Sequence, residues 1–181
     1  MQSKLFKNVA LPALLAAVII VGALIRFNIF TVPYSLQLFA VTLAYFVGGP
    51  KRGTAAVAVY IALGLLGLPV FTAGGGIGYV LTPTFGYIAG FLLAAAVGGI
   101  IRGKNPNYLR FLLAGLAGNA IIYLFGSVWF YVIMNFYVGT PYGVWQIITV
   151  CVLPFILTDA AAVALAALIA LRLKKAMATL F

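Results

Sequence analysis

Asp159 is the first residue to consider for chemistry, because it is the only acidic residue in the chain. The 181 residues include no histidine and a single cysteine, Cys151. Catalysis by paired carboxylates needs a second acid, a nucleophilic triad needs a base, and a metal site needs several clustered ligands. Cys151 has no partner for a disulfide within the chain and is interpreted as a small apolar residue. We therefore predict that the protein is not an enzyme and that it holds no metal and no cofactor.

Asp159 is instead a candidate for ligand binding. It lies five residues into the last apolar segment, which begins at Pro154. A charge inside a membrane span costs about 2.5 to 3.5 kcal/mol, so a carboxylate there usually has a partner or a function. Arg26 is expected at a similar depth, at the end of the first apolar segment. Two interpretations of Asp159 stay open, ligand binding and a structural ion pair with Arg26, and the two can overlap. Arg26 is either an interfacial anchor or a residue of the same pocket.

Other polar residues and several aromatic residues are expected near the same level as Asp159. Aromatic side chains around a few hydrogen-bonding groups suit a small, partly apolar ligand. The candidate ligand-binding residues are Asp159, Arg26, Gln37, Phe71, Gly75, Tyr79, Tyr87, Asn119, Tyr123 and Trp129. An interfacial belt of Tyr and Trp would explain many of the aromatic residues equally well, and this alternative stays open.

The uncharged stretch "FTAGGGIGYVLTPTFGY" at 71–87 is rich in glycine but does not match a phosphate-binding motif. "GGGIGY" differs from G-x-G-x-x-G, and "GGPKRGT" at 48–54 lacks the spacing of a Walker motif. Glycine allows an uncharged chain to turn tightly and to approach a ligand closely. We therefore predict a glycine-rich loop that folds over a cavity.

The composition indicates a membrane protein. Apolar residues make up 66% of the chain and charged residues 7%, with a mean hydropathy of +1.23. A soluble domain of this length cannot bury so much apolar surface, whereas membrane helices expose it to lipid. We predict one all-α domain over residues 1–181, with six transmembrane helices in one bundle. The predicted spans are Val9–Ile25, Val32–Val47, Thr54–Leu68, Thr84–Ile101, Phe111–Met134 and Pro154–Leu171, with a short interfacial or re-entrant helix at Val144–Leu153.

The basic residues predict the orientation of these spans. The net charge of +10 comes from eleven Lys and Arg residues, which lie mostly between the apolar segments. Ten of them fall on one side of the membrane: Lys4, Lys7, Lys51, Arg52, Arg102, Lys104, Arg110, Arg172, Lys174 and Lys175. By the positive-inside rule both termini are cytoplasmic, and the glycine-rich loop between the third and fourth spans is outside. This distribution also argues against nucleic-acid binding, which needs basic residues gathered on a solvated face.

Short motifs along nearly the whole chain point to one family. They are "VPYSLQLF" at 32–39, "GPKRG" at 49–53, "GLLGLPVF" at 64–71, "PTFGYIAGF" at 83–91, "GNAIIYLFG" at 118–126 and "LPFILTDA" at 153–160. In these motifs the chain resembles the BioY family of substrate-binding components (S components) of energy-coupling factor (ECF) vitamin transporters. The resemblance implies a prokaryotic cell-membrane protein that binds biotin and assembles with a membrane coupling subunit and two cytoplasmic ATPases. It also implies that Ala13 and Ala17, a small-x-x-x-small pair, contact the coupling subunit.

Two positions depart from the family's motifs. Ala162 stands where the family's P-G-D-x-x-K has Lys, and Phe85 stands where P-T-G-G-Y has the first Gly. The changes remove a cation and add an aromatic ring, so lipoate or a similar carboxylate is an alternative ligand. A membrane protein with a purely structural or interaction role, in which Arg26 and Asp159 only pair, is a second alternative.

Overall fold

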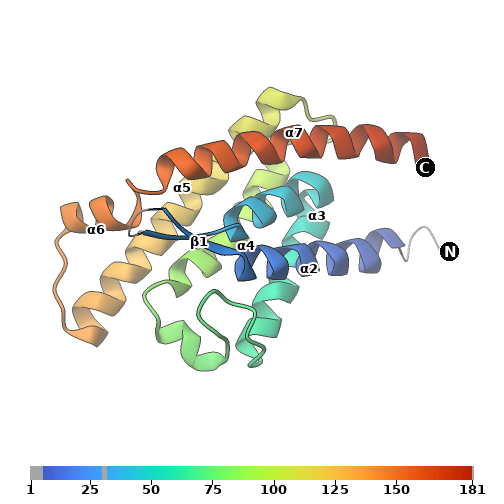
Figure 1. Ribbon diagram of the computed structural model, residues 1–181. Helices are drawn as coiled ribbons and strands as arrows, with labels where there is room; N and C mark the ends of the chain where they lie inside the picture. The colour runs from blue at the N-terminus through green and yellow to red at the C-terminus, as the bar shows by residue number, and fades with distance from the viewer. Residues whose placement is uncertain (1–5, 30–31, 181) are drawn as a thin grey trace.

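The protein is a bundle of helices with one small β-hairpin (Figure 1). The computed structural model describes residues 6–29 and 32–180. Its elements in chain order are a π-helical turn η1 (Phe6–Ala10), α2 (Leu11–Leu24), β1 (Arg26–Ile29), β2 (Val32–Ser35), α3 (Gln37–Leu65), a 3-10 turn η2 (Ile77–Leu81), α4 (Phe85–Ile101), α5 (Tyr108–Val132), a π-helical turn η3 (Ile133–Val138), α6 (Val144–Cys151) and α7 (Ile156–Leu180).

Helix α3 contains the second and third predicted spans, which meet at a sharp break. Gly49 has φ 71° and ψ −169°, a conformation outside the helical region, and Pro50 follows it. A residue with a side chain rarely adopts this φ, and proline cannot donate the next helical hydrogen bond. The chain therefore reverses between two helices here, as the predicted spans require.

The hairpin corrects one predicted boundary. Val32 was expected to begin the second span, but Val32–Ser35 form β2, and the helix begins only at Gln37. Strands β1 and β2 pair in antiparallel fashion, with Arg26 opposite Ser35. Pro33 lacks an N–H for a ladder or a helix, and its fixed φ suits an extended segment at an edge. The all-α prediction therefore missed this two-stranded element.

The other predicted elements agree with the structure to within a few residues at most ends. The first span corresponds to α2 with its preceding π-helical turn, and the fourth to α4. The fifth begins three residues before Phe111 and continues through η3 to Val138, while the last helix extends past Leu171 to Leu180. The short helix expected at Val144–Leu153 is α6. The third span ends at Leu65 rather than Leu68.

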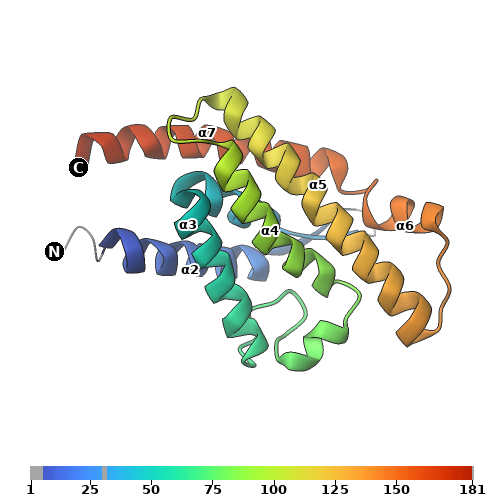
Figure 2. The same cartoon turned by 180° about the vertical axis from the view of Figure 1, so that it is seen from behind.

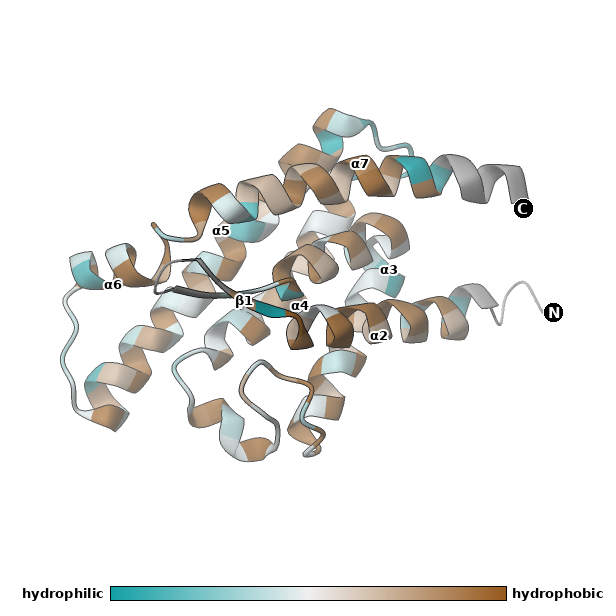
Figure 3. Cartoon of the chain, viewed as in Figure 1, coloured by the Kyte–Doolittle hydropathy of each residue, from teal (hydrophilic) through white to brown (hydrophobic). Residues whose placement is uncertain are grey.

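Helix α3 lies at the centre of the bundle, packed against α2, α4 and α7, and α5 packs against α4 and α7 (Figures 1 and 2). The core contains Tyr45, Phe46, Tyr60 and Phe111, all fully buried. Large apolar side chains remain exposed on α2, α4, α5 and α7. Figure 3 shows long hydrophobic stretches along α2 and α7. Such exposure is costly in water and favourable in lipid.

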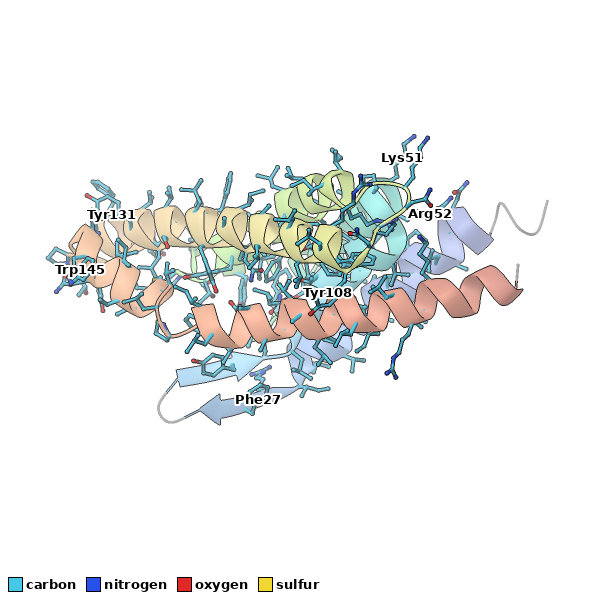
Figure 4. All side chains as sticks on the ribbon, turned by 90° about the horizontal axis from the view of Figure 1, so that it is seen from above. Phe27, Lys51, Arg52, Tyr108, Tyr131 and Trp145 are labelled. Atoms are coloured by element: carbon cyan, nitrogen blue, oxygen red, sulfur yellow. The ribbon has the colours of Figure 1, made fainter. Side chains whose placement is uncertain are left out.

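Two helical segments, Tyr108–Val138 and Ile156–Lys174, are long and apolar enough to cross a membrane on their own. The segments Asn8–Leu24 and Phe85–Ile101 are apolar but shorter. The start of α2 and the end of α7 lie at the same end of the molecule (Figure 1). Lys51 and Arg52 lie toward this end, whereas Trp145 of α6 lies at the opposite end (Figure 4). This arrangement is the one expected if the basic end faces the cytoplasm.

Candidate ligand-binding site

A cavity of about 400 Å³ opens among the hairpin, the starts of α3 and α4, the middle of α5, and the α6–α7 connection. This volume lies within the range of small-molecule sites. Most of its wall is apolar or aromatic. The lining residues are Arg26, Tyr34, Ser35, Gln37, Leu38, Thr72, Ala73, Tyr79, Thr84, Tyr87, Ile88, Phe91, Ile122, Tyr123, Phe130, Val150, Cys151, Phe155 and Asp159.

The carboxylate of Asp159 is held at one wall of the cavity by a tyrosine. The hydroxyl of Tyr123 on α5 donates to Oδ2 of Asp159 on α7 at 2.6 Å. Both side chains are only partly buried and line the cavity. Tyr123 occupies one of the lone-pair positions of a group that can accept about four hydrogen bonds. The carboxylate can therefore accept further N–H or O–H groups from a ligand.

Gln37 presents a second polar group whose orientation is fixed. Thr72 Oγ1 donates to Gln37 Oε1 at 2.9 Å, and Gln37 Nε2 donates to the Tyr60 hydroxyl at 2.8 Å. Only 5% of the Gln37 surface is exposed, and that part faces the cavity. An amide has two donor hydrogens and two acceptor lone pairs, so Gln37 keeps one of each for a ligand.

Arg26 is the only cation on the cavity wall, among the residues that the structure describes. It lies on β1 and is exposed. The carboxylate of Asp159 is bonded to Tyr123 rather than to Arg26. Arg26 and Asp159, which both belong to the described residues, form no ion pair in this structure, so the cation and the anion of the cavity are both available to a ligand.

Six of the ten candidate ligand-binding residues line this cavity: Asp159, Arg26, Gln37, Tyr79, Tyr87 and Tyr123. The other four do not. Asn119 is buried within the bundle on α5, and Gly75 lies in the loop away from the wall. Phe71 and Trp129 instead hold the glycine-rich loop, residues 66–84, against the helices.

Trp129 fixes the second half of this loop. Its indole N–H lies 3.2 Å from the carbonyl oxygens of both Val80 and Thr82. The positive φ angles of Gly74 and Gly76 allow the tight turns of the first half. The loop contributes Thr72, Ala73, Tyr79 and Thr84 to the cavity wall.

Phe71 fixes the first half of the loop from inside the core. Its fully buried ring lies 5.5 Å from the Tyr60 ring and 4.7 Å from the Tyr79 ring, between centroids. It also packs directly on Gly64 of α3, where a Cβ atom would lie only 2.1 Å from Phe71 Cζ. A methyl group at position 64 would have to displace this ring.

We therefore expect Gly64→Ala to loosen the loop. Because overpacking of this kind typically costs about 1 to 3 kcal/mol, the variant should unfold at a lower temperature and the loop should be cleaved faster by protease. Gly78→Ala is the matched control, because a Cβ there meets nothing within 4 Å and φ is not positive. Thermal unfolding and limited proteolysis in detergent check the prediction. Equal behaviour of the two variants would contradict the packing described.

Sequence reasoning missed several residues of the wall, chiefly Tyr34, Thr72, Phe91 and Phe155. Tyr34 and Phe155 meet across the hairpin and the α6–α7 connection, with ring centroids 5.2 Å apart. Tyr34 belongs to the motif "VPYSLQLF", which also contains Gln37, and Phe155 belongs to "LPFILTDA", which also contains Asp159. Their position beside a candidate ligand-binding residue is the sequence signal that could have identified them.

Comparison with known proteins identifies the family. The BioY family model matches residues 1–179. The chain belongs to the BioY family. It is 43% identical over 160 residues to the biotin transporter BioY of Thermotoga maritima, covering 88% of this chain and 90% of that protein. It is 41% identical over 169 residues to a probable biotin transporter BioY of Pyrococcus horikoshii, covering 93% and 96%.

A BioY-like fold is also found by structural comparison. A crystal structure of the S component for biotin from an ECF-type ABC transporter matches with a TM-score of 0.81 and 26% sequence identity. The match covers 97% of this chain and 94% of that one. The predicted family and the predicted helical membrane fold are thereby confirmed. Because the BioY relatives are transporter components, the prediction that this protein is not an enzyme is confirmed as well.

The two departures from the BioY motifs lie outside the cavity wall. Phe85 packs against Trp129, with ring centroids 6.0 Å apart, and so supports the loop from behind. Ala162 lies on α7 one turn beyond Asp159 and does not line the cavity. The added ring therefore does not shape the wall.

Ala13 and Ala17 lie on the surface of the bundle. Both are exposed on α2, whereas Leu15, Ala16 and Ile19 form the face buried against the core. A small-x-x-x-small pair on an outward face can be approached closely by another helix. Their position leaves the pair accessible to a second protein.

Proposed function

We propose that this chain is the S component of an ECF-type vitamin transporter and that it binds biotin in the cavity between the hairpin and α7. The observation that carries this proposal is the composition of the wall. One carboxylate, Asp159, and one guanidinium, Arg26, lie on a wall that is otherwise aromatic, aliphatic or neutral polar. The family and the relatives that transport biotin support the same conclusion.

The chemistry of biotin matches these groups one by one. Its cyclic urea carries two N–H donors and a carbonyl acceptor, which suit Asp159 and the amide of Gln37. Its thioether ring and alkyl chain suit aromatic residues such as Tyr79 and Phe91. Its carboxylate suits the guanidinium of Arg26, which forms strong charge-assisted hydrogen bonds.

Lipoate fits the wall less well. It offers a carboxylate to Arg26, but its dithiolane ring has no N–H or O–H group for Asp159. Binding it would bury a carboxylate against an apolar ring, which is costly without a compensating hydrogen bond. The added Phe85, which had suggested a less polar ligand, lies behind the loop rather than on the wall. Biotin is therefore the ligand that the cavity favours.

We further propose that the cavity faces outward and that transport requires partners. The basic residues Lys51 and Arg52 lie toward the end where α2 starts and α7 ends, which supports a cytoplasmic location for both termini (Figure 4). A membrane coupling subunit would contact the exposed Ala13 and Ala17, and two cytoplasmic ATPases would supply the energy for release. The sequence contains no Walker motif of its own, in agreement with this division of labour.

Arg26→Gln tests the proposed recognition of a carboxylate. Loss of one charge-assisted contact should weaken biotin binding about tenfold and leave the binding of biotinamide, its neutral amide, nearly unchanged. Arg52→Gln is the control, because Arg52 is a cation outside the cavity wall. Isothermal titration of the purified variants with both compounds gives the two affinities. Equal losses for acid and amide would show that Arg26 has a structural role only.

A further inference from the structure

The hairpin β1–β2 carries the cation of the cavity but has few attachments to the rest of the molecule. Its base is closed by a backbone hydrogen bond from Leu36 to Ile25 at 3.2 Å. Its register places Arg26 opposite Ser35 and Phe27 opposite Tyr34. Cross-strand partners point to the same face of a hairpin, so Arg26 and Ser35 share one face. An isolated two-stranded hairpin is marginally stable, so it needs an anchor.

Tyr34 provides this anchor. Its hydroxyl donates to the carbonyl oxygen of Pro154 at 2.7 Å, and its ring packs on Phe155 at 5.2 Å between centroids. On its other side the ring stacks on Phe27 of β1, at 6.1 Å and 13° between the ring planes. Among the side chains that the structure describes, Tyr34 forms the one side-chain hydrogen bond that joins the hairpin to another element.

Phe155, on which Tyr34 packs, is joined by a backbone hydrogen bond to Asp159, the anion of the cavity. The backbone N–H of Asp159 donates to the carbonyl oxygen of Phe155 at 2.8 Å, so Phe155 and Asp159 belong to the same helical turn. Tyr34 thus touches the turn that presents the carboxylate, while its own hairpin presents the guanidinium. The contact therefore joins the two segments that carry the charges of the cavity.

We propose that Tyr34 is a positioning residue that fixes Arg26 relative to Asp159, and thereby makes the site prefer a ligand with a carboxylate at one end and N–H donors at the other. The inference rests on the proposed function, because it assumes that Arg26 meets the carboxylate of biotin. Tyr34 favours a ligand with this carboxylate because it holds the hairpin, and with it Arg26, in place. A ligand that lacks the charge gains nothing from the fixed position of Arg26.

The test is the ratio of biotin affinity to biotinamide affinity in four variants. Tyr34→Phe keeps the ring contact with Phe155 but removes the hydrogen bond to Pro154. We expect it to lower the ratio about threefold or more, with biotinamide affinity changed by less than about twofold. Tyr34→Phe combined with Arg26→Gln should lower the ratio no further than Arg26→Gln alone, because both changes act through one contact.

Tyr87→Phe is the matched control. Tyr87 also lines the cavity and donates its hydroxyl to a backbone carbonyl, that of Cys151 at 2.9 Å, but it has no link to the hairpin. It should leave the ratio at the wild-type value, even if both affinities fall. A purely structural role for Tyr34 would give the same pattern as Tyr87, with parallel losses for acid and amide.

The outcomes separate this inference from the proposed function. If Arg26→Gln lowers the ratio and Tyr34→Phe does not, the role of Tyr34 is overturned while the carboxylate contact of Arg26 stands. If Arg26→Gln keeps the wild-type ratio, both the carboxylate contact and the role of Tyr34 are overturned. If the wild-type protein binds neither compound, the proposed function itself fails.

Discussion

Asp159→Asn is expected to weaken biotin binding by about a hundredfold or more. Hydrogen bonds to a charged group are worth about 1.5 to 3 kcal/mol each, and two N–H groups of the urea ring are available to the carboxylate. The asparagine side chain has nearly the same size but replaces one acceptor oxygen with a donor amide, which opposes a ligand N–H. Titration of the purified variant with biotin measures the loss.

The stability of the same variant separates a binding role from a structural one. A neutral amide costs less to place in a membrane span than a carboxylate, and the Tyr123 hydroxyl can still donate to its oxygen. Without ligand, Asp159→Asn should therefore unfold at the wild-type temperature or above it. A variant with unchanged biotin affinity and a lower unfolding temperature would mean that Asp159 stabilises the helix bundle and does not bind the ligand.

Ala13→Trp combined with Ala17→Trp is expected to reduce biotin uptake to background while biotin binding stays intact. Both alanines are exposed on α2, so two indoles there would keep a coupling subunit from close approach without entering the core. Uptake of labelled biotin by cells that also contain the coupling subunit and ATPases gives the first readout. Titration of the purified variant gives the second.

The control for this pair lies on another face of the bundle. Leu116 and Ala120 have the same spacing of four residues and are exposed on α5. Tryptophan at both positions adds similar bulk against lipid and should leave uptake near the wild-type level. Equal loss of uptake in both pairs would indicate a general defect in the membrane. Loss of biotin binding in the α2 pair would show that these alanines are needed for packing within the S component and would contradict a role limited to contact with the coupling subunit.

The helices of this protein could be predicted from the sequence because their ends carry strong local signals. Charged residues and turn formers separate the apolar segments, and Gly49–Pro50 marks the reversal within α3. The hairpin at 26–35 could not be predicted in this way. Val32–Ser35 directly precede the apolar segment of α3 and were therefore included in the second span. The position of the hairpin depends on a contact between Tyr34 and Phe155, which are 121 residues apart.

The residues of the candidate site could be predicted from the sequence where a polar or charged side chain lies in an apolar membrane segment, because placing it there costs free energy. Asp159, Gln37 and Arg26 stand out because polar groups are rare in apolar segments, and all three line the cavity. Aromatic residues are common in membrane helices, and their chemistry does not indicate whether they face a ligand or support a loop. Tyr79, Tyr87 and Tyr123 line the wall, whereas Phe71 and Trp129 hold the glycine-rich loop from behind. Only the packing distinguishes these roles.

The most direct test of the proposed function is isothermal titration of the purified protein with biotin and, separately, with lipoate. The structure predicts one biotin site per chain, with lipoate binding weaker by at least about a hundredfold because it offers no N–H group to Asp159. Tighter binding of lipoate, or no heat with biotin on protein shown to be folded, would contradict the assignment of this cavity to biotin.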